Sequence, residues 1–178
     1  MRHCSSIHNL LATFQAYLGE VKTIDTTRST LRGGHSIPYI PHIAINKDQA
    51  IQQHDTSHYG IKIYSDDSAH REGVAAAVVL YRPGKAPWTL AYYLGSDKHH
   101  TVYKAEVIGL TLAVQLLLSE DSSNTPITIY IDNKVAILSS ESPSSTAGSY
   151  LMDKFIRLAH VLKKKYTDQE LDLRLLVK

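Results

Sequence analysis

The sequence has one cysteine, Cys4, among its 178 residues, and this excludes an internal disulfide. A lone thiol is typical of proteins that fold in a reducing compartment, so we expect an intracellular location, cytoplasmic or nuclear. Long hydrophobic runs are lacking too. The apolar run at 10–14 is too short and too interrupted for a signal peptide, and we expect no transmembrane segment and no membrane partner.

The chain also has little net charge, with 19 basic and 17 acidic residues and a formal net charge of +2. This balance is compatible with binding to nucleic acid but does not argue for it. An apolar share of 43% and a charged share of 20% are typical of a globular protein. At this length the chain can form one domain with a core of its own, together with an arm.

Residues 1–59 and 60–178 differ in their patterns. The first part contains a helical candidate at 7–18, an extended stretch at 23–42 with two Gly and two Pro, and a short helix expected at 46–54. Its histidines lack the spacing of metal ligands. We therefore expect an N-terminal helix and an extended arm or connector in 1–59, followed by a folded domain in 60–178.

A phrase of four residues, Ile-Tyr-x-Asp, occurs twice in this domain, at 63–66 and at 129–132. Each copy ends an apolar run of strand length. Because side chains alternate between the two faces of a strand, each Asp shares a face with its Tyr. If the two strands are parallel neighbours in matching register, about 4.8 Å apart, the carboxylates of Asp66 and Asp132 nearly touch.

A third acid, Glu106, lies between these aspartates on a helix expected at 101–120. It falls within about 40° of Leu110 and Leu117, on the apolar stripe of that helix. A carboxylate on a buried stripe is unfavourable unless it is neutralised, and three carboxylates aimed at one point repel each other. A divalent cation resolves both problems, and oxygen ligands favour Mg²⁺ or Mn²⁺.

The order of elements predicts an α/β protein with a mixed sheet. Three strand-length runs joined by short turns indicate an antiparallel meander. The helix at 101–120 then forms a crossover to a parallel strand, after which two helices and a final strand follow. The expected strands are 61–66, 74–81, 88–94, 127–132 and 171–177, with turns at 67–73 and 82–87 and later helices at 133–138 and 150–165.

This order of elements and acids resembles the ribonuclease H family, specifically the domain carried by fungal retrotransposon reverse transcriptases. The resemblance covers about 61–177, and 43–54 resembles the connector that precedes the domain in such polyproteins. It implies a ribonuclease H-like fold with a five-stranded sheet in the order 3-2-1-4-5, flanked by helices. The matching motifs are Tyr64-Ser65-Asp66-Asp67-Ser68, Tyr103-Lys104-Ala105-Glu106 and Ile131-Asp132-Asn133.

The resemblance implies that Asp66, Glu106 and Asp132 bind two Mg²⁺ (or Mn²⁺) ions and are the catalytic residues of an endonuclease. The substrate would be an RNA–DNA hybrid, of which the RNA strand is cleaved. Ser68 and Asn133 are weaker candidates for substrate contacts, because turn formation and helix capping explain them equally well. The implied partners are the hybrid and the reverse transcriptase part of a retroelement polyprotein.

Two departures from the family leave an alternative open. Asp67 replaces a glycine and adds a negative charge beside the expected metal site. The family's fourth acid, on a final helix after the fifth strand, has no counterpart before Lys178, so we expect that helix to be missing. The alternative is a catalytically inactive remnant that serves only as a weak nucleic-acid-binding or interaction module. A transposase or integrase would place its Glu after both aspartates. Here Glu106 lies between Asp66 and Asp132, so the sequence does not fit that class.

Overall fold

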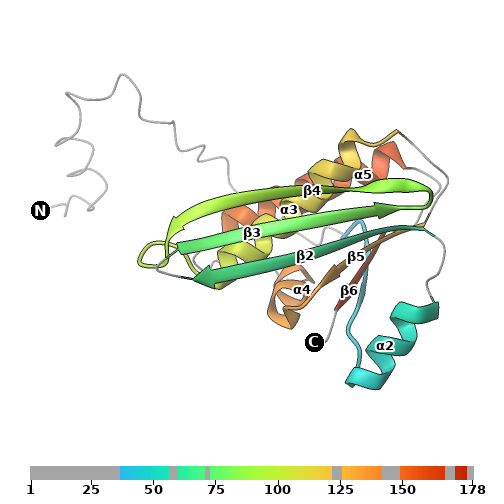
Figure 1. Cartoon of the computed structure of the whole chain (residues 1–178), viewed down its shortest axis with the longest axis horizontal. Coiled ribbons are helices and arrows are strands. Elements are labelled where there is room, and N and C mark those ends of the chain that lie inside the picture. The colour runs from blue at the N-terminus through green and yellow to red at the C-terminus, as the bar shows by residue number, and fades with distance from the viewer. Residues whose placement is uncertain are drawn as a thin grey trace, which may run out of the picture. The chain divides into compact units, whose positions relative to one another are not determined.

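The computed structural model describes residues of one unit of the chain, Leu31–Lys178 (Figure 1). The helix expected at 7–18 lies outside the described residues. The ranges described are 37–56, 60–70, 73–121, 126–141, 149–166 and 171–175.

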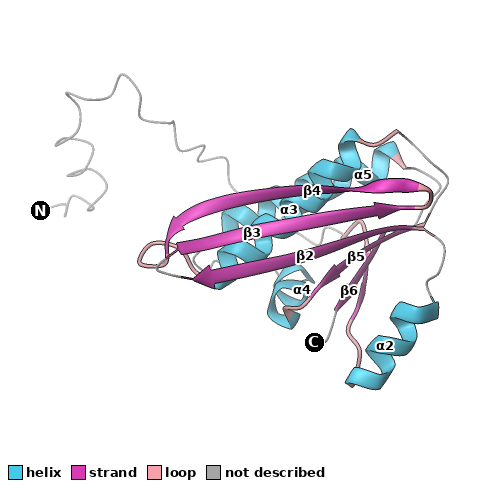
Figure 2. Ribbon diagram, viewed as in Figure 1, coloured by secondary structure: helices cyan, strands magenta, loops and turns pink. Residues whose placement is uncertain are grey.

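A mixed sheet of six strands lies at the centre of this unit, in the order β1-β6-β5-β2-β3-β4 (Figure 2). The five strands expected from the sequence are neighbours in the expected order 3-2-1-4-5, so the predicted fold class is confirmed. The expected number of five was wrong by one, because β1 adds an edge strand parallel to β6. The strands are β1 (Ile40–His42), β2 (Ile61–His70), β3 (Gly73–Arg82), β4 (Lys85–Ser96), β5 (Ile127–Ile131) and β6 (Leu171–Leu175).

β2 and β5 are parallel neighbours in the register that the repeated phrase requires. Ile63 is opposite Ile129, and Tyr64 is opposite Tyr130. The pairing ends there, because β5 stops at Ile131 whereas β2 continues alongside β3. The aspartates that complete the two copies of the phrase therefore follow at the same end of the paired strands.

The hairpin of β2 and β3 is longer than the sequence analysis predicted. Its ladder runs from Lys62 opposite Tyr81 to His70 opposite Gly73, so 67–70 continue a strand where a turn was expected. β4 likewise begins inside the expected second turn. Pairing along a long ladder satisfies the backbone groups of these polar residues, and this overrides their local preference for turns.

Three helices lie on one face of the sheet: α3 (Val102–Ser119), α4 (Lys134–Glu141) and α5 (Ser149–Lys165) (Figure 1). Thr101 caps α3 as expected, with its side chain accepting a hydrogen bond from the backbone N–H of Lys104 at 3.3 Å. α3 is long and apolar enough to cross a membrane, but more than half of it is buried within the fold, as in a core helix. The core between helices and sheet includes Ile63, Val78, Leu80, Val107, Leu110, Val114, Leu117, Ile129, Phe155 and Leu162.

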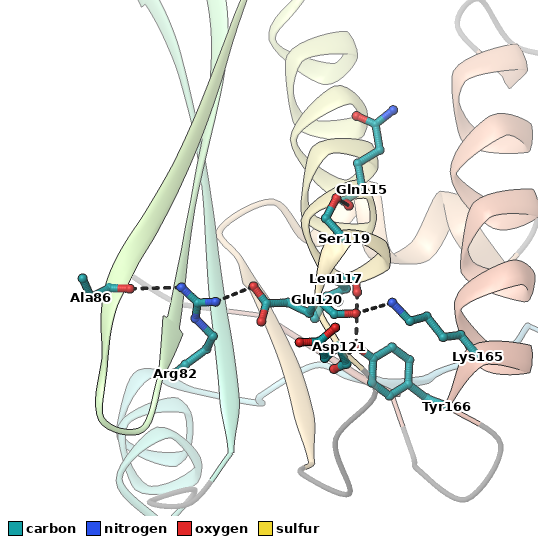
Figure 3. A network of polar contacts seen from close by, with 9 residues as sticks. All are labelled: Arg82, Ala86, Gln115, Leu117, Ser119, Glu120, Asp121, Lys165 and Tyr166. Carbon is teal, nitrogen blue, oxygen red and sulfur yellow. Dashed lines mark hydrogen bonds and ion pairs between the residues drawn. The ribbon is translucent and has the colours of Figure 1, made fainter.

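The C-terminal end of α3 is held by side chains from two other elements (Figure 3). At the end of α5, Lys165 donates hydrogen bonds from Nζ to the carbonyl oxygens of Leu118, at 2.7 Å, and of Glu120. The Tyr166 hydroxyl donates to the carbonyl oxygen of Leu117 at 3.1 Å. On β3, Arg82 donates from Nη1 to Glu120 Oε1 at 2.6 Å. Lys165 and Tyr166 thereby donate to carbonyl oxygens of the last turn of α3, where partners within the helix run out.

The second face of the sheet carries a cluster of tyrosine side chains, and α2 (Lys47–Thr56) contacts this cluster. The rings of Tyr64 and Tyr130 stack with centroids 5.0 Å apart, and Tyr81 packs edge-on against Tyr64 at 5.6 Å. His54 of α2 lies with Nε2 2.8 Å from the Tyr64 hydroxyl oxygen. Burial raises the pKa of Tyr64 to about 12, and Tyr130 and Tyr81 contribute to this. These packed tyrosines fix the faces of β2 and β5 near the aspartates.

Candidate metal centre

Three aspartates meet where the pairing of β2 and β5 ends. Asp66 and Asp67 lie on β2, and Asp132 directly follows β5. One carboxylate oxygen from each of the three lies within 4.8 Å of the others. Asp66 is exposed, whereas Asp67 and Asp132 are partly buried. The structure therefore brings together both aspartates of the repeated phrase, and a third one with them.

Glu106 approaches the same point from the first turns of α3. Its side chain is only 2% exposed, as expected from its place on the apolar stripe. It is hydrogen-bonded to Asp67 and Asp132, and Oε2 is left without a partner in the described part of the chain. We refer to Asp66, Asp67, Glu106 and Asp132 as the carboxylate cluster.

The surroundings of Glu106 favour its protonated form when no cation is bound. Burial, followed by the hydrogen bonds to Asp67 and Asp132 and the negative charges of those residues, together raise its pKa from 4.5 to about 9. A carboxyl group can donate to a carboxylate only if it carries a proton. The proton thus partly offsets the repulsion within the cluster.

A close contact between α3 and β2 sets the distance between Glu106 and the strand. Gly109 lies one turn after Glu106, and a Cβ built at Gly109 would lie 2.2 Å from Oγ of Ser65. Ser65 is 4% exposed, and it precedes Asp67 by two residues on the same face of β2. The absence of a side chain at Gly109 therefore lets the helix approach the strand where the cluster forms.

Asp67 is the member of the cluster that the sequence analysis did not include. The sequence indicates only an added charge at a glycine position, whereas in the structure Asp67 is the β2 residue that is hydrogen-bonded to Glu106. A signal was present in the sequence. Alternation places Asp67 on the face of Ile63 and Ser65, which is the face that α3 covers.

The two weaker candidates lie outside the cluster. Ser68 is exposed on β2. Asn133 caps α4, with Oδ1 accepting hydrogen bonds from the backbone N–H groups of Val135 at 2.9 Å and Ala136 at 3.3 Å. Contacts of either residue with a nucleic acid stay predictions.

The carboxylate cluster fits a hard divalent cation. All of its side-chain donors are carboxylate oxygens, which Mg²⁺ and Mn²⁺ prefer over nitrogen or sulfur. The unpartnered, buried Oε2 of Glu106 is a donor that no described residue satisfies. A bound cation would satisfy this atom and offset the mutual repulsion of the acids.

Comparison with solved structures supports the fold. The chain is similar to LC11-RNase H1 in complex with an RNA/DNA hybrid, with a TM-score of 0.50 and 18% identity over 66% of this chain and 86% of that chain. Together with the order of the strands, this likeness shows that the chain has a ribonuclease H-like fold.

Two other solved structures are also similar. They are RNase H1 from the halophilic archaeon Halobacterium salinarum NRC-1 (TM-score 0.48, 15% identity, 66% of this chain and 86% of that chain) and LC11-RNase H1 isolated from compost (TM-score 0.48, 18% identity, 63% and 81%). No family model matches the chain, and no curated protein matches it significantly.

Proposed function

We propose that this protein is a metal-dependent endonuclease that cleaves the RNA strand of RNA–DNA hybrids. The observation that carries the proposal is the carboxylate cluster at the end of two paired parallel strands, within a ribonuclease H-like fold. The substrate class is supported by the similar LC11-RNase H1, whose structure contains an RNA/DNA hybrid. Such hybrids are recognised by minor-groove shape and by ribose 2′-hydroxyl groups, so we expect no sequence preference.

In this proposal Asp66, Glu106 and Asp132 are the catalytic residues and hold two Mg²⁺ or Mn²⁺ ions. When bound, such ions lower the pKa of a water and stabilise the leaving oxygen of the cleaved strand. Exposed Asp66 presents its carboxylate toward solvent, where a phosphate can approach. A bound cation would compete with the proton that the surroundings of buried Glu106 favour, and the position of Glu106 on α3 would orient its donor atoms.

We further propose that the domain derives from a retroelement polyprotein, with a reverse transcriptase as partner. The support is the resemblance of its motifs to that branch of the family. The division into a connector at 1–59 and a domain at 60–178 and the intracellular location are part of the same proposal.

A cleavage assay tests the proposed function. The purified chain is incubated with a labelled RNA strand that is single-stranded, paired with RNA or paired with DNA, in Mg²⁺, Mn²⁺ or EDTA. We expect cleavage of the hybrid alone, only with a divalent cation, and none by Asp132→Asn. Asp97→Asn is the matched control, because Asp97 is exposed in the turn after β4 and undergoes the same loss of charge.

Two results would contradict the proposal. Cleavage by Asp132→Asn at the rate of Asp97→Asn would show that the activity does not come from this site. Binding of the hybrid without cleavage, unaffected by Asp132→Asn, would favour the inactive remnant.

A further inference from the structure

We propose that a pocket on the second face of the sheet binds one unpaired nucleotide of a nucleic-acid strand that passes the carboxylate cluster. The pocket is lined by Lys62, Tyr64, Val79 and Tyr81 and has a volume of about 460 Å³; we refer to it as the tyrosine pocket. Sites for small molecules typically have volumes of about 300–1,000 Å³. Only the path of the strand past the cluster rests on the proposed function, because the pocket itself can be tested for nucleotide binding without cleavage.

The tyrosine pocket lies between β2 and β3. In their antiparallel ladder Lys62 is opposite Tyr81, and Tyr64 is opposite Val79. Paired residues share a face, and alternate residues along each strand share it too, so all four side chains lie on the same face. Figure 2 shows this face toward the viewer, with α3 and α5 behind the two strands. The sheet therefore separates the pocket from the core beneath the helices.

The two tyrosine rings of the pocket are held in place by their neighbours. Tyr64 stacks on Tyr130, with centroids 5.0 Å apart, and its hydroxyl oxygen lies 2.8 Å from Nε2 of His54. Tyr81 packs edge-on against Tyr64 and is 47% exposed. Bases of any identity stack on aromatic rings, because every base has a flat π-face. A ring whose position is already fixed loses little freedom when a base binds to it.

Lys62 provides a positive charge beside these rings. In the part of the chain that the structure describes, no ion pair or hydrogen bond engages its side chain. An apolar helix docked over the pocket would bury the ammonium group without a counter-charge, which is unfavourable. A nucleotide instead brings a phosphate together with its flat base. Proteins that bind single strands combine basic groups and aromatic rings in the same way, with charge for the backbone and rings for the bases.

The tyrosine pocket and the carboxylate cluster lie along the same strand. Lys62, Tyr64 and Asp66 alternate onto one face of β2. At about 3.3 Å per residue, Lys62 and Asp66 are about 13 Å apart along the strand. This is about four steps of a nucleic-acid strand at about 3.4 Å each. A strand with a phosphate at Asp66 can therefore place a nearby nucleotide over Tyr64 and Tyr81.

The nucleotide in the pocket has to be unpaired. In a duplex, each base is covered by its stacked neighbours and by its pairing partner, so it cannot lie against a protein ring. The occupant is therefore a single-stranded extension of the hybrid, and the pocket contributes affinity without reading the sequence.

Binding of single-stranded DNA in EDTA tests the pocket, because such DNA is not a substrate of the proposed ribonuclease. Fluorescence anisotropy is measured with a labelled DNA of about six nucleotides. We expect Tyr81→Ala to weaken binding about tenfold, because one base loses its stacking partner, and Tyr81→Phe to retain the affinity. Tyr92→Ala is the matched control: Tyr92 is 54% exposed and lies opposite Ala76, on the face of the sheet that the helices cover.

The charge of Lys62 is tested through the salt dependence of the same binding. Each phosphate contact contributes about 0.7 to the slope of log affinity against log salt concentration for a single strand. We expect Lys62→Gln to lower the magnitude of this slope by about 0.7. Lys154→Gln, on the exposed side of α5, undergoes the same loss of charge and should leave the slope unchanged.

Three results would overturn the proposal. The first is binding by Tyr81→Ala that equals binding by Tyr92→Ala, with thermal unfolding showing that both variants are folded. The second is a lack of DNA binding by the wild type, or an affinity for free AMP as high as that for the DNA. The third is a change in the oligomeric state of Tyr81→Ala without a change in DNA binding, which would show that the pocket is a contact between copies of the chain.

The proposed function can fail separately from the nucleotide pocket. A chain that binds single-stranded DNA through Tyr81 but leaves hybrids intact keeps the pocket and loses the nuclease. A chain that cuts hybrids while Tyr81→Ala binds DNA as Tyr92→Ala does keeps the nuclease and loses the pocket.

Discussion

Gly109→Ala tests whether the contact between α3 and β2 sets the geometry of the carboxylate cluster. The new methyl carbon would lie 2.2 Å from Ser65 Oγ, but 3.5 Å from Ser65 Cβ and 4.0 Å from Ala76 Cβ. The conflict is thus confined to one oxygen atom. Overpacking at a buried site costs about 1–3 kcal/mol. Replacing Gly by Ala inside a helix stabilises it by about 1 kcal/mol, so Gly109→Ala should lower the free energy of unfolding by up to about 2 kcal/mol.

Ser65→Ala removes the conflicting oxygen and should reverse the sign of the effect that Gly109→Ala has on the free energy of unfolding. The hydroxyl is buried and has no hydrogen-bond partner among the residues that the structure describes, so its loss alone should cost little. In the Ser65→Ala background, Gly109→Ala meets only ordinary contacts and should raise the free energy of unfolding by about 1 kcal/mol.

The assay is urea denaturation of the four proteins in EDTA, with Mn²⁺ affinity as the second measurement. Gly109→Ala should also weaken Mn²⁺ binding, because it displaces the helix that carries Glu106, and Ser65→Ala should restore the affinity. Equal stabilisation of the protein by Gly109→Ala in both backgrounds would contradict this expectation. In that case the Ser65 hydroxyl rotates away at no cost, and the contact between Gly109 and Ser65 does not set the distance between α3 and β2.

Two further predictions concern the charge of Glu106 and the end of α3. Because the pKa of Glu106 is raised from 4.5 unfolded to about 9 folded, its protonated form contributes stability that is complete below pH 4.5 and lost as pH rises through 9. Metal-free wild type should therefore lose stability between pH 5 and 9, by at most about 1.4 kcal/mol per pH unit from this group, and Glu106→Gln should lose less. The measurement is the free energy of unfolding, from urea denaturation at pH 5, 7 and 9. An equal change with pH in the wild type and in Glu106→Gln would contradict this prediction. Lys165→Met removes donors to the carbonyl oxygens of Leu118 and Glu120, so it should lower the free energy of unfolding by about 1–2 kcal/mol. It should leave Mn²⁺ affinity unchanged, and an unchanged stability would show that the cap contributes nothing.

The pairing at the centre of the fold could be predicted from the repeated phrase alone. Matching Ile and Tyr residues of two strands can share a core face and an aromatic face only if the register aligns them, and the structure has this register. The burial of Glu106 followed in the same way from its place on the stripe of an amphipathic helix.

The features that escaped prediction depend on contacts distant in sequence. β1 has only three residues and contains Pro41, so it shows no periodic pattern, and its partner β6 lies far along the chain. The place of Asp67 depended on whether β2 continues beyond Asp66. A turn was expected at 67–73, and a turn gives no face to which Asp67 can be assigned. Pairing with β3 continues the strand and thereby turns Asp67 toward α3.

We expect Asp66, Asp67, Glu106 and Asp132 together to hold divalent cations. Anomalous diffraction from crystals soaked in Mn²⁺ tests it most directly, because the metal is located independently of activity. We expect an anomalous peak within coordination distance of Glu106, Asp67 and Asp132. Crystals with strong Mn²⁺ peaks elsewhere, and none among these four carboxylates, would contradict it.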